Sequence, residues 1–332
     1  MNKVSIRVPA TSANCGSGFD TLGLACTLYN EVTYEITSSR GFQLEVTGEG
    51  AEYLKPCGRN LAFASFLRVW NEVTARERIG LKVTMHNRIP MSRGLGSSSS
   101  AIVAGIYAGN ILSGNRFNDD ELLGFATEIE GHPDNVAPAL LGGFTISYMD
   151  GRKAHSLRVE PAKPLKFIAV VPERRLPTVL ARQAIPKTVS HHDAVFNTSR
   201  ASLLVGALLS GEYQYLASGL EDKLHQPYRA HLIPGLDDVF EAARNAGAYN
   251  AIISGAGSTV MAYADVNADH EKIARAMQDA FLKNNEPCAY HILELDLDGV
   301  KELLVRNMEH AMEMKVILTA ELNTGHSWYD LK

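Results

Sequence analysis

The chain has 332 residues, of which 45% are apolar and 21% are charged, with a formal net charge of −5. This composition predicts a globular protein that is long enough for two domains. The negative charge and the lack of a long basic run argue against nucleic-acid binding. No apolar run is long enough to span a bilayer, so we expect no membrane association.

The cysteines indicate a reducing compartment. Cys15, Cys26, Cys57 and Cys288 fall at irregular spacings and form no Cys-x-x-Cys pair, which disfavours a zinc site and a redox dithiol. Residues 3–8 alternate as a strand does and do not resemble a signal peptide. We therefore expect a cytoplasmic protein with reduced thiols.

The first elements in chain order are short strands, expected at residues 3–9, 29–37 and 42–47. Residues 38–41 read Ser-Ser-Arg-Gly, and this turn sequence predicts that the last two strands form a hairpin. Asn60 is expected to open a helix that runs to about residue 76, and the alternation over 80–88 predicts a strand.

Asn118, followed by acidic residues, predicts a helix N-cap, and that helix should run to about Glu130. The next residues, Gly-His-Pro-Asp-Asn at 131–135, predict a compact polar loop. A strand over 142–148 and the Asp-Gly pair at 150–151 indicate a hairpin.

The sequence Pro-Ala-Lys-Pro at 161–164 is the expected domain boundary. The second half mixes helices with a small antiparallel sheet, an α+β pattern. Helices are expected at 177–184, 192–210, 236–246 and 269–284. Strands are expected at 165–171, 248–254, 259–264 and 289–296. The charged residues beyond about 305 are compatible with a helix, and no role follows from them.

Within residues 90–101, two glycines at 94 and 96 and four serines at 97–100 lie directly before the apolar run 101–106. Glycines let backbone N–H groups crowd around an anion, and a helix start carries unpaired N–H groups and a positive dipole end. This predicts a phosphate cradle. A flexible Gly/Ser linker is the alternative, disfavoured because the segment runs straight into a helix. The P-loop Gly-Lys pair, the third glycine of the dinucleotide fingerprint and a Gly-x-Ser-x-Gly elbow are all missing.

Three further segments accompany the cradle. Residues 9–20 read Pro-Ala-Thr-Ser-Ala-Asn-Cys-Gly-Ser-Gly-Phe-Asp, residues 130–138 read Glu-Gly-His-Pro-Asp-Asn-Val-Ala-Pro, and residues 254–259 read Ser-Gly-Ala-Gly-Ser-Thr. In this order, the four motifs resemble the GHMP small-molecule kinase superfamily over about residues 3–305. The segment at 130–138 is typical of its homoserine kinase branch.

The resemblance implies an α+β fold with two domains and a site in the cleft between them. Residues 1–160 should form a domain like domain 2 of ribosomal protein S5, and residues 165–305 a ferredoxin-like domain. Residues 306–332 would be a tail of unknown role. The implied activity is transfer of phosphate from ATP, with Mg²⁺, to the side-chain hydroxyl of L-homoserine, a step of L-threonine biosynthesis. The alternatives are a kinase for another small carboxylated alcohol and a non-catalytic nucleotide-binding protein.

The resemblance assigns the ATP phosphates to the cradle, here Pro90, Met91, Ser92, Arg93, Gly94, Leu95, Gly96, Ser97, Ser98, Ser99 and Ser100. It assigns supporting contacts to Gly255, Gly257 and Ser258, whose simpler interpretation is a glycine turn between two strands. The adenine is expected near the first hairpin and Asn60. Mg²⁺ prefers hard oxygen ligands, and we expect Glu130 and the Ser98 hydroxyl to supply them, with Glu128 as the competitor.

His132, Asn135 and Asp20 are the expected catalytic residues. Some sister kinases have an aspartate at the position of Asn135, and an asparagine cannot take a proton. The chemistry implied is direct attack by the hydroxyl on the γ-phosphate without a strong general base. A purely structural role for His132 stays open, as does an Asx-turn role for Asp20.

A carboxylated substrate requires arginine, and the resemblance points to Arg182 and Arg229. Thr178 lies four residues before Arg182 and should share its helix face. The residues expected to bind the small-molecule substrate are Asn14, Asp20, Thr178, Arg182 and Arg229. A homodimer is left open.

Overall fold

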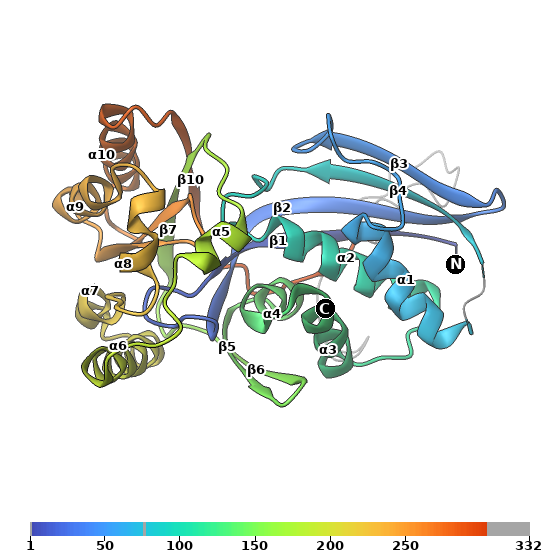
Figure 1. The fold of residues 1–332 in the computed structure, drawn as a ribbon, viewed down its shortest axis with the longest axis horizontal. Helices are drawn as coiled ribbons and strands as arrows, with labels where there is room; N and C mark the ends of the chain where they lie inside the picture. Colours follow the sequence, from blue (N-terminus) through green and yellow to red (C-terminus); the bar gives the residue numbers. More distant parts are fainter. Residues whose placement is uncertain (1, 76–77, 304–332) are drawn as a thin grey trace, which may run out of the picture.

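The computed structural model describes residues 2–75 and 78–303 of the chain. These residues form two lobes, each built on its own sheet (Figure 1). Residues 306–332, the expected tail, lie outside the described residues. Among the described residues, no helix combines the length and apolar character needed to cross a bilayer.

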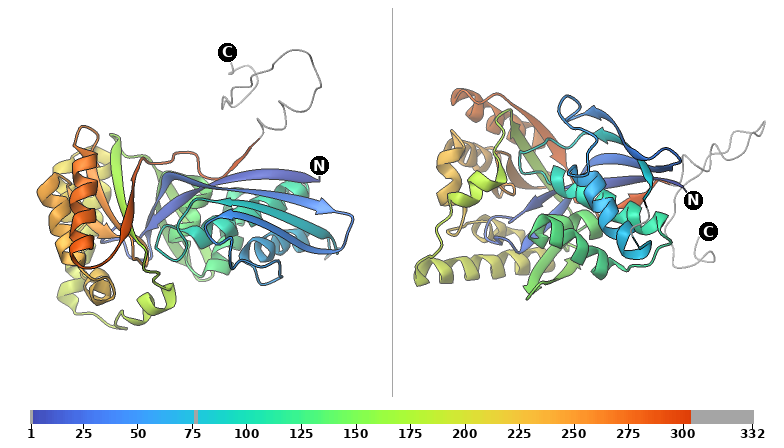
Figure 2. Two further views of the ribbon diagram at one scale, coloured as in Figure 1. Left: turned by 90° about the horizontal axis from the view of Figure 1, so that it is seen from above. Right: turned by 45° about the vertical axis from the view of Figure 1, so that its right-hand side comes forward.

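The first lobe contains a seven-stranded sheet with the order β11-β1-β2-β4-β3, and β5 pairs with β2 and β6. Its strands are β1 (Lys3–Ala13), β2 (Leu22–Thr37), β3 (Gly41–Gly48), β4 (Gly80–Asn87), β5 (Phe144–Asp150), β6 (Lys153–Val159) and β11 (Lys301–Glu302). Four helices cover one face of this sheet (Figure 2). They are α1 (Leu61–Val73), α2 (Ser97–Leu112), α3 (Asp119–Glu130) and α4 (Pro133–Leu141).

Local signals explain where these helices begin. The Asn60 side chain accepts a hydrogen bond from the N–H of Ala62 at the start of α1, which ends three residues before the expected end. Asn118 and Glu121 form a capping box at the start of α3. Both N-caps and the β5–β6 hairpin were expected from the sequence. The turn of the hairpin lies at residues 151–152, one residue later than the expected Asp150–Gly151 pair, because Asp150 still pairs with Lys153.

The predicted hairpin across residues 38–41 is wrong. β2 does not pair with β3, because β4 lies between them, antiparallel to β2 and parallel to β3. The turn sequence at 38–41 reverses the chain, but the pairing is decided by the later strand β4, which inserts between the two. β3 is consequently an outer strand, and every second side chain on it is exposed.

The expected polar loop over 131–135 is also wrong, since α4 begins at Pro133. Proline at the first helical position has no N–H to leave unpaired, and its fixed φ suits a helix start. Gly131, with φ of 94°, ends α3, so only Gly131 and His132 separate the two helices.

The second lobe has an antiparallel four-stranded sheet in the order β10-β7-β9-β8. Its strands are β7 (Leu165–Pro172), β8 (Asn250–Ile253), β9 (Val260–Asp265) and β10 (Cys288–Leu293). The two middle strands are the first and third of the four in chain order, which is the ferredoxin-like arrangement that was expected. The helices that pack on one face are α9 (Leu236–Ala246) and α10 (His270–Lys283).

The opposite face of this sheet packs against α6 (His191–Ser210), α7 (Leu216–Gly219) and residues of the first lobe. Leu24 and Phe144 from the first sheet share one buried cluster with Phe167 and Met261 from the second. The remaining short helices are α5 (Thr178–Gln183), α8 (Gln226–Arg229) and the 3₁₀ turns η1 (Tyr213–Tyr215) and η2 (Ala230–Leu232).

The chain crosses between the two lobes twice. It leaves the first sheet after β6 and returns through a bridge between Cys26 and Leu295. It then pairs Lys301 and Glu302 of β11 with Arg7 and Ile6 of β1. The expected domain boundary at 161–164 coincides with the first crossing. Residues 301–302, however, lie beyond the second sheet in the chain and pair with the first sheet. The division into folding units at 1–160 and 165–305 stays a prediction.

Candidate active site

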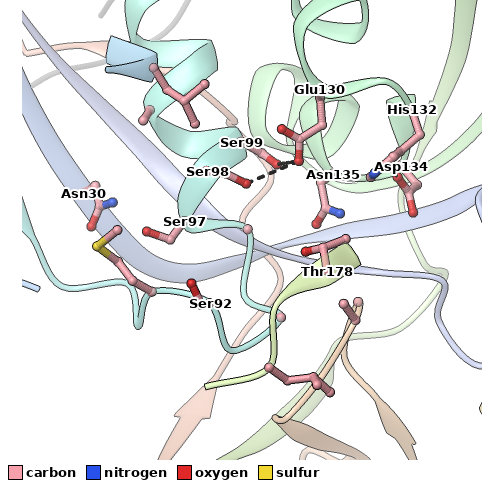
Figure 3. Close-up of a pocket in the computed structure, with 18 of the residues that line it drawn as sticks. Asn30, Ser92, Ser97, Ser98, Ser99, Glu130, His132, Asp134, Asn135 and Thr178 are labelled. Atoms are coloured by element: carbon pink, nitrogen blue, oxygen red, sulfur yellow. Dashed lines mark hydrogen bonds and ion pairs between the residues drawn. The ribbon is translucent and has the colours of Figure 1, made fainter. Parts of the chain in front are cut away.

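A cavity of about 420 Å³ lies where the two lobes meet. The start of α2, the start of α4, α5 and the turn at 255–256 all reach it, as the labelled side chains in Figure 3 show for the first three. Segments from positions 14 to 256 thus converge on one space, and several carry the residues expected from the sequence.

The predicted cradle opens into this cavity. Gly96 is the N-cap of α2 with φ of 70° and no side-chain cap, so the N–H groups of the first turn remain available to an anion. A Cβ on Gly96 would lie 1.9 Å from Thr11 Oγ1, so the position requires glycine. The cradle residues that line the cavity are Met91, Ser92, Gly94, Gly96, Ser97, Ser98 and Ser99.

Other cradle residues face away from the cavity. Leu95 is buried in the core between the lobes, and the Ser100 hydroxyl donates to the carbonyl of Ser97. Arg93 donates to the carbonyls of Pro172 and Glu173 in the second lobe. Pro90 is also absent from the cavity wall.

The turn after β8 holds the cradle in place. Ser254 Oγ donates to the Gly94 carbonyl at 2.7 Å, and the Thr259 N–H donates to the Arg93 carbonyl at 3.1 Å. Gly255 lines the cavity, whereas Gly257 and Ser258 do not; the Ser258 hydroxyl donates to the Arg174 carbonyl. A Cβ on Gly94 would lie 2.1 Å from the Ser254 carbonyl oxygen, so close approach of the lobes depends on this glycine.

Glu130 is the carboxylate that faces the cradle. Its Oε1 accepts hydrogen bonds from Ser99 Oγ at 2.9 Å and from Ser98 Oγ at 3.3 Å (Figure 3). Glu128 points elsewhere and forms an ion pair with Arg68 at 3.0 Å on the surface. One carboxylate with two hydroxyls at the end of a phosphate cradle is a set of hard oxygen donors that fits Mg²⁺.

His132 and Asp134 form a hydrogen-bonded ion pair at the start of α4 (Figure 3). Burial opposes charge on the imidazole, but the hydrogen bond and the charge of Asp134 outweigh it, so the pKa of His132 lies above 6.5. No role for Asp134 was predicted from the sequence, although its side chain is only 2% exposed. The available signal was an aspartate two residues from a histidine.

Asn135 faces the cavity with its amide orientation fixed. Its Oδ1 accepts a hydrogen bond from Thr11 Oγ1 at 2.8 Å, which leaves the Nδ2 group as a donor on the cavity side. Thr11 belongs to the first motif, but no role of its own was predicted for it. It touches both the Asn135 amide and the position of Gly96.

Asp20 and Arg182 meet across the cavity in a bidentate ion pair, with N–O distances of 2.7 and 3.0 Å. Burial works against the charged guanidinium, but the bonds to Asp20 outweigh it and the pKa of Arg182 is raised. Asp20 has φ of 54°, so the loop aims its side chain from a left-handed conformation. The arginine fork expected to be free for a substrate is thus occupied by a carboxylate of the protein.

Asn14 lines the cavity, but the protein already uses both ends of its amide. Its Nδ2 donates to the Gly255 carbonyl at 2.8 Å and its Oδ1 accepts from the Asp20 N–H at 3.0 Å. Asn14 therefore ties the first motif to the turn after β8. Thr178, the first residue of α5, lines the cavity beside Arg182, as the four-residue spacing predicted.

Arg229 reaches the cavity although its side chain is almost fully buried. Burial, reinforced by the charge of Arg182, lowers its pKa to about 10. Its Nε donates to the Ala181 carbonyl, and its Nη1 donates to the Gly255 carbonyl and to His225 Nδ1. Unlike a surface arginine, it is held in one position.

Asp20, His132 and Asp134 place ligand-type atoms within 4.8 Å of one another. Both carboxylates of this group are engaged, Asp20 with Arg182 and Asp134 with His132. A cation there would have to displace both pairs, and an imidazole is a poor ligand for Mg²⁺. Glu130 with its two serines is the better fit.

The far end of the cavity is less polar. It is lined by Leu54, Asn60, Leu61, Met85 and Met91. The adenine was expected beside Asn60, and apolar side chains with a few polar groups are the usual lining of a ligand pocket.

Comparison with known families agrees with this geometry. Residues 60–143 match the family described as "GHMP kinases N terminal domain", and residues 204–283 match the family described as "GHMP kinases C terminal". The chain belongs to the GHMP kinases. Its relatives include homoserine kinases at about 40% identity over most of the chain.

The homoserine kinase of Carboxydothermus hydrogenoformans is 43% identical over 84% of this chain and 90% of its own. That of Clostridium kluyveri is 38% identical over 91% and 99%. Among solved structures, homoserine kinase from Cytophaga hutchinsonii superposes with a TM-score of 0.83 at 31% identity, covering 91% of this chain and 98% of that one. A mevalonate kinase of L. major has a TM-score of 0.65 at 18% identity, which shows the shared fold.

Proposed function

We propose that this protein transfers the γ-phosphoryl group of ATP to the side-chain hydroxyl of L-homoserine and so forms O-phospho-L-homoserine for L-threonine biosynthesis. The observation that carries the proposal is the pairing of two unlike ends in one cavity. A helix-start cradle suits phosphate, and a charged end with Asp20, Arg182 and Arg229 suits an amino acid. The homoserine kinase relatives support this choice of acceptor.

The acceptor end is complementary to a zwitterion. Homoserine carries an ammonium group and a carboxylate on one carbon, and the Asp20–Arg182 pair presents the opposite charges side by side. The ammonium would take Asp20 and the carboxylate would take Arg182, so each charge of the protein keeps a partner when the substrate replaces the internal pair. Arg229 adds a second guanidinium on the carboxylate side, and Thr178 borders the space.

Phosphoryl transfer chiefly requires positioning and charge neutralisation. The N–H groups at the start of α2 would hold the phosphates, and Glu130 with Ser98 would hold Mg²⁺. The ion, when bound, supplies positive charge to the phosphate oxygens. The Asn135 Nδ2 group would orient the reacting hydroxyl or a γ-phosphate oxygen.

We also propose that the hydroxyl attacks without a strong general base. The Asn135 amide cannot take a proton. Asp134 raises the pKa of His132 and so favours its protonated form, and Asp20 would be bound to the ammonium group of the substrate. If His132 were the base, kcat would fall as the pH drops through its pKa. We expect kcat to be retained as His132 becomes protonated, and a loss that disappears in His132→Asn would contradict this.

The direct test is ADP release coupled to phosphorylation of a panel of small alcohols in the presence of Mg²⁺. We expect turnover with L-homoserine, with O-phospho-L-homoserine identified by mass. Turnover of another carboxylated alcohol but not of homoserine would favour the alternative kinase. ATP binding with no transfer to any alcohol would show a nucleotide-binding protein instead. The proposed location is the cytoplasm.

A further inference from the structure

His225 lies behind the acceptor end of the cavity and is fully buried. It precedes α8 and does not line the cavity itself. Asp222 fixes this turn, because its carboxylate accepts hydrogen bonds from the backbone N–H groups of Leu224, His225 and Gln226. The phosphoryl transfer proposed above gives no role to either nitrogen of its imidazole.

The two ring nitrogens have different partners. Nδ1 lies 3.2 Å from Arg229 Nη1, and Nε2 lies 2.8 Å from the Gly16 carbonyl oxygen. A guanidinium has only donors, so Nδ1 must carry the lone pair, and the proton must be on Nε2, where it is donated to Gly16. The contacts thus define one neutral tautomer.

Arg229 then has few hydrogens left. A guanidinium has five N–H bonds. Nε uses one on Ala181, and Nη1 uses two on Gly255 and His225. The two on Nη2 make no hydrogen bond among the described residues. They are the ones left for a ligand carboxylate in the cavity that Arg229 lines.

The Phe19 ring completes the arrangement. It stacks on His225 with a centroid distance of 5.3 Å, and the guanidinium carbons of Arg229 and Arg182 lie 5.5 and 5.9 Å from its centre. These distances are within the range of cation–π attraction. Phe19 directly precedes Asp20, so the ring connects both arginines to the loop that carries the acidic partner.

We propose that His225 is a positioning residue for the acceptor. Its Nδ1 lone pair fixes Arg229 so that Nη2 faces the cavity, and the donation of Nε2–H to Gly16 keeps that lone pair on Nδ1. The inference rests on the proposed function, because it assigns the second arginine to the substrate carboxylate.

Neutrality of the imidazole is part of this role. Burial, together with the charge of Arg229, lowers the pKa of His225 despite the opposing effects of Asp222 and Asp20. A proton on Nδ1 would put two donors and two positive charges against each other. The surroundings therefore keep the ring in the form that accepts from Arg229.

Two substitutions separate the two contacts. The Oδ1 of His225→Asn lies about where Nδ1 lies and can accept from Arg229, but the side chain is too short to reach Gly16. His225→Gln reaches Gly16 but offers nothing to Arg229. We expect His225→Gln to raise the KM for homoserine about tenfold or more, as expected when a hydrogen bond to a charged group is lost. His225→Asn should stay within about threefold of the wild type.

The KM for ATP should be unchanged in both variants. The neighbouring exposed His231, changed to Gln, is the control for a histidine outside the network. Combining His225→Gln with Arg229→Lys should add no further loss, because both changes act on the same contact. Thermal melting checks that each variant is folded.

Several results would overturn the inference. One is an equal rise of the KM for ATP and for homoserine, and another is full additivity with Arg229→Lys. If His225→Gln does not fold, a tenfold rise of the homoserine KM in folded His225→Asn is equally decisive against it. Failure of the proposed function is seen separately, as lack of homoserine turnover by the wild type.

Discussion

The two ends of the cavity are built in opposite ways. The cradle end is made from one continuous segment, and its donors are backbone N–H groups and serine hydroxyls. The acceptor end draws charged side chains from three separate segments, carrying Asp20, Arg182 and Arg229, and two of these charges neutralise each other. A phosphate group can be bound by the donors of one short segment, whereas recognition of a particular amino acid needs charged side chains that the fold brings together from several segments.

The largest expected effect lies at the border between the two ends. Glu130→Gln keeps the size of the side chain but removes the negative charge proposed to hold Mg²⁺. We expect kcat to fall about a thousandfold, the scale of lost electrostatic stabilisation in a transition state. Glu128→Gln, on the same helix but paired with Arg68, is the matched control. Steady-state assays at saturating ATP measure the fall in kcat. Equal losses of kcat in both variants would refute Glu130 as the Mg²⁺ ligand.

At the acceptor end, Arg182→Ala should raise the KM for homoserine about a hundredfold, the scale of a lost charged hydrogen-bond pair. The KM for ATP should be unchanged, because the cradle contains no contact with Arg182. Arg200→Ala removes an arginine that pairs with Glu221 outside the cavity and serves as the control. Loss of ATP binding in Arg182→Ala would show that the two ends are not separate.

At the cradle end, Gly94→Ala tests the contact between the lobes. The new methyl group would meet the Ser254 carbonyl, and the position has φ of 79°. Gly131→Ala has a similar φ of 94° but an open surrounding. We expect Gly94→Ala to lower the free energy of unfolding by about 2 kcal/mol more than Gly131→Ala does. Equal losses in urea unfolding would mean that only backbone strain matters there.

The smallest effect concerns pH. The pKa of His132 is raised in the folded state, so its pair with Asp134 contributes stability below pH 6.5 that is lost as the pH rises through the folded-state pKa. The free energy of unfolding should therefore fall over that interval in the wild type relative to Asp134→Asn. Urea titrations at several pH values measure this difference, and identical pH profiles would contradict the ion pair.

Much of the fold could be predicted from local signals, because caps and turns depend on near neighbours. Asn60 and Asn118 cap helices where the sequence predicted them, and the β5–β6 turn lies within one residue of its predicted position. The pairing of β3 could not be predicted, since its partner is β4, which lies some forty residues later in the chain. The start of α4 was not predicted, because proline is common both in turns and at the first position of a helix, and Pro133 was interpreted as part of a turn.

The site divides in the same way. The cradle was visible because one segment contains all its donors. Which of Glu128 and Glu130 faces the cradle could not be predicted, because it depends on which side of α3 faces α2. The Asp20–Arg182 pair joins residues 162 positions apart, and no spacing rule connects them. Family resemblance named the residues; their mutual engagement came from the geometry.

The short strand β11 has a consequence for how the chain can be divided. Residues 301 and 302 are the last described strand, yet they cover the edge of the first strand, β1. A fragment cut near residue 162 would leave that edge open, and open edges invite pairing with other chains. The first sheet therefore includes a strand from the far end of the described chain, and we expect that splitting the protein at its apparent boundary would favour aggregation of the first half.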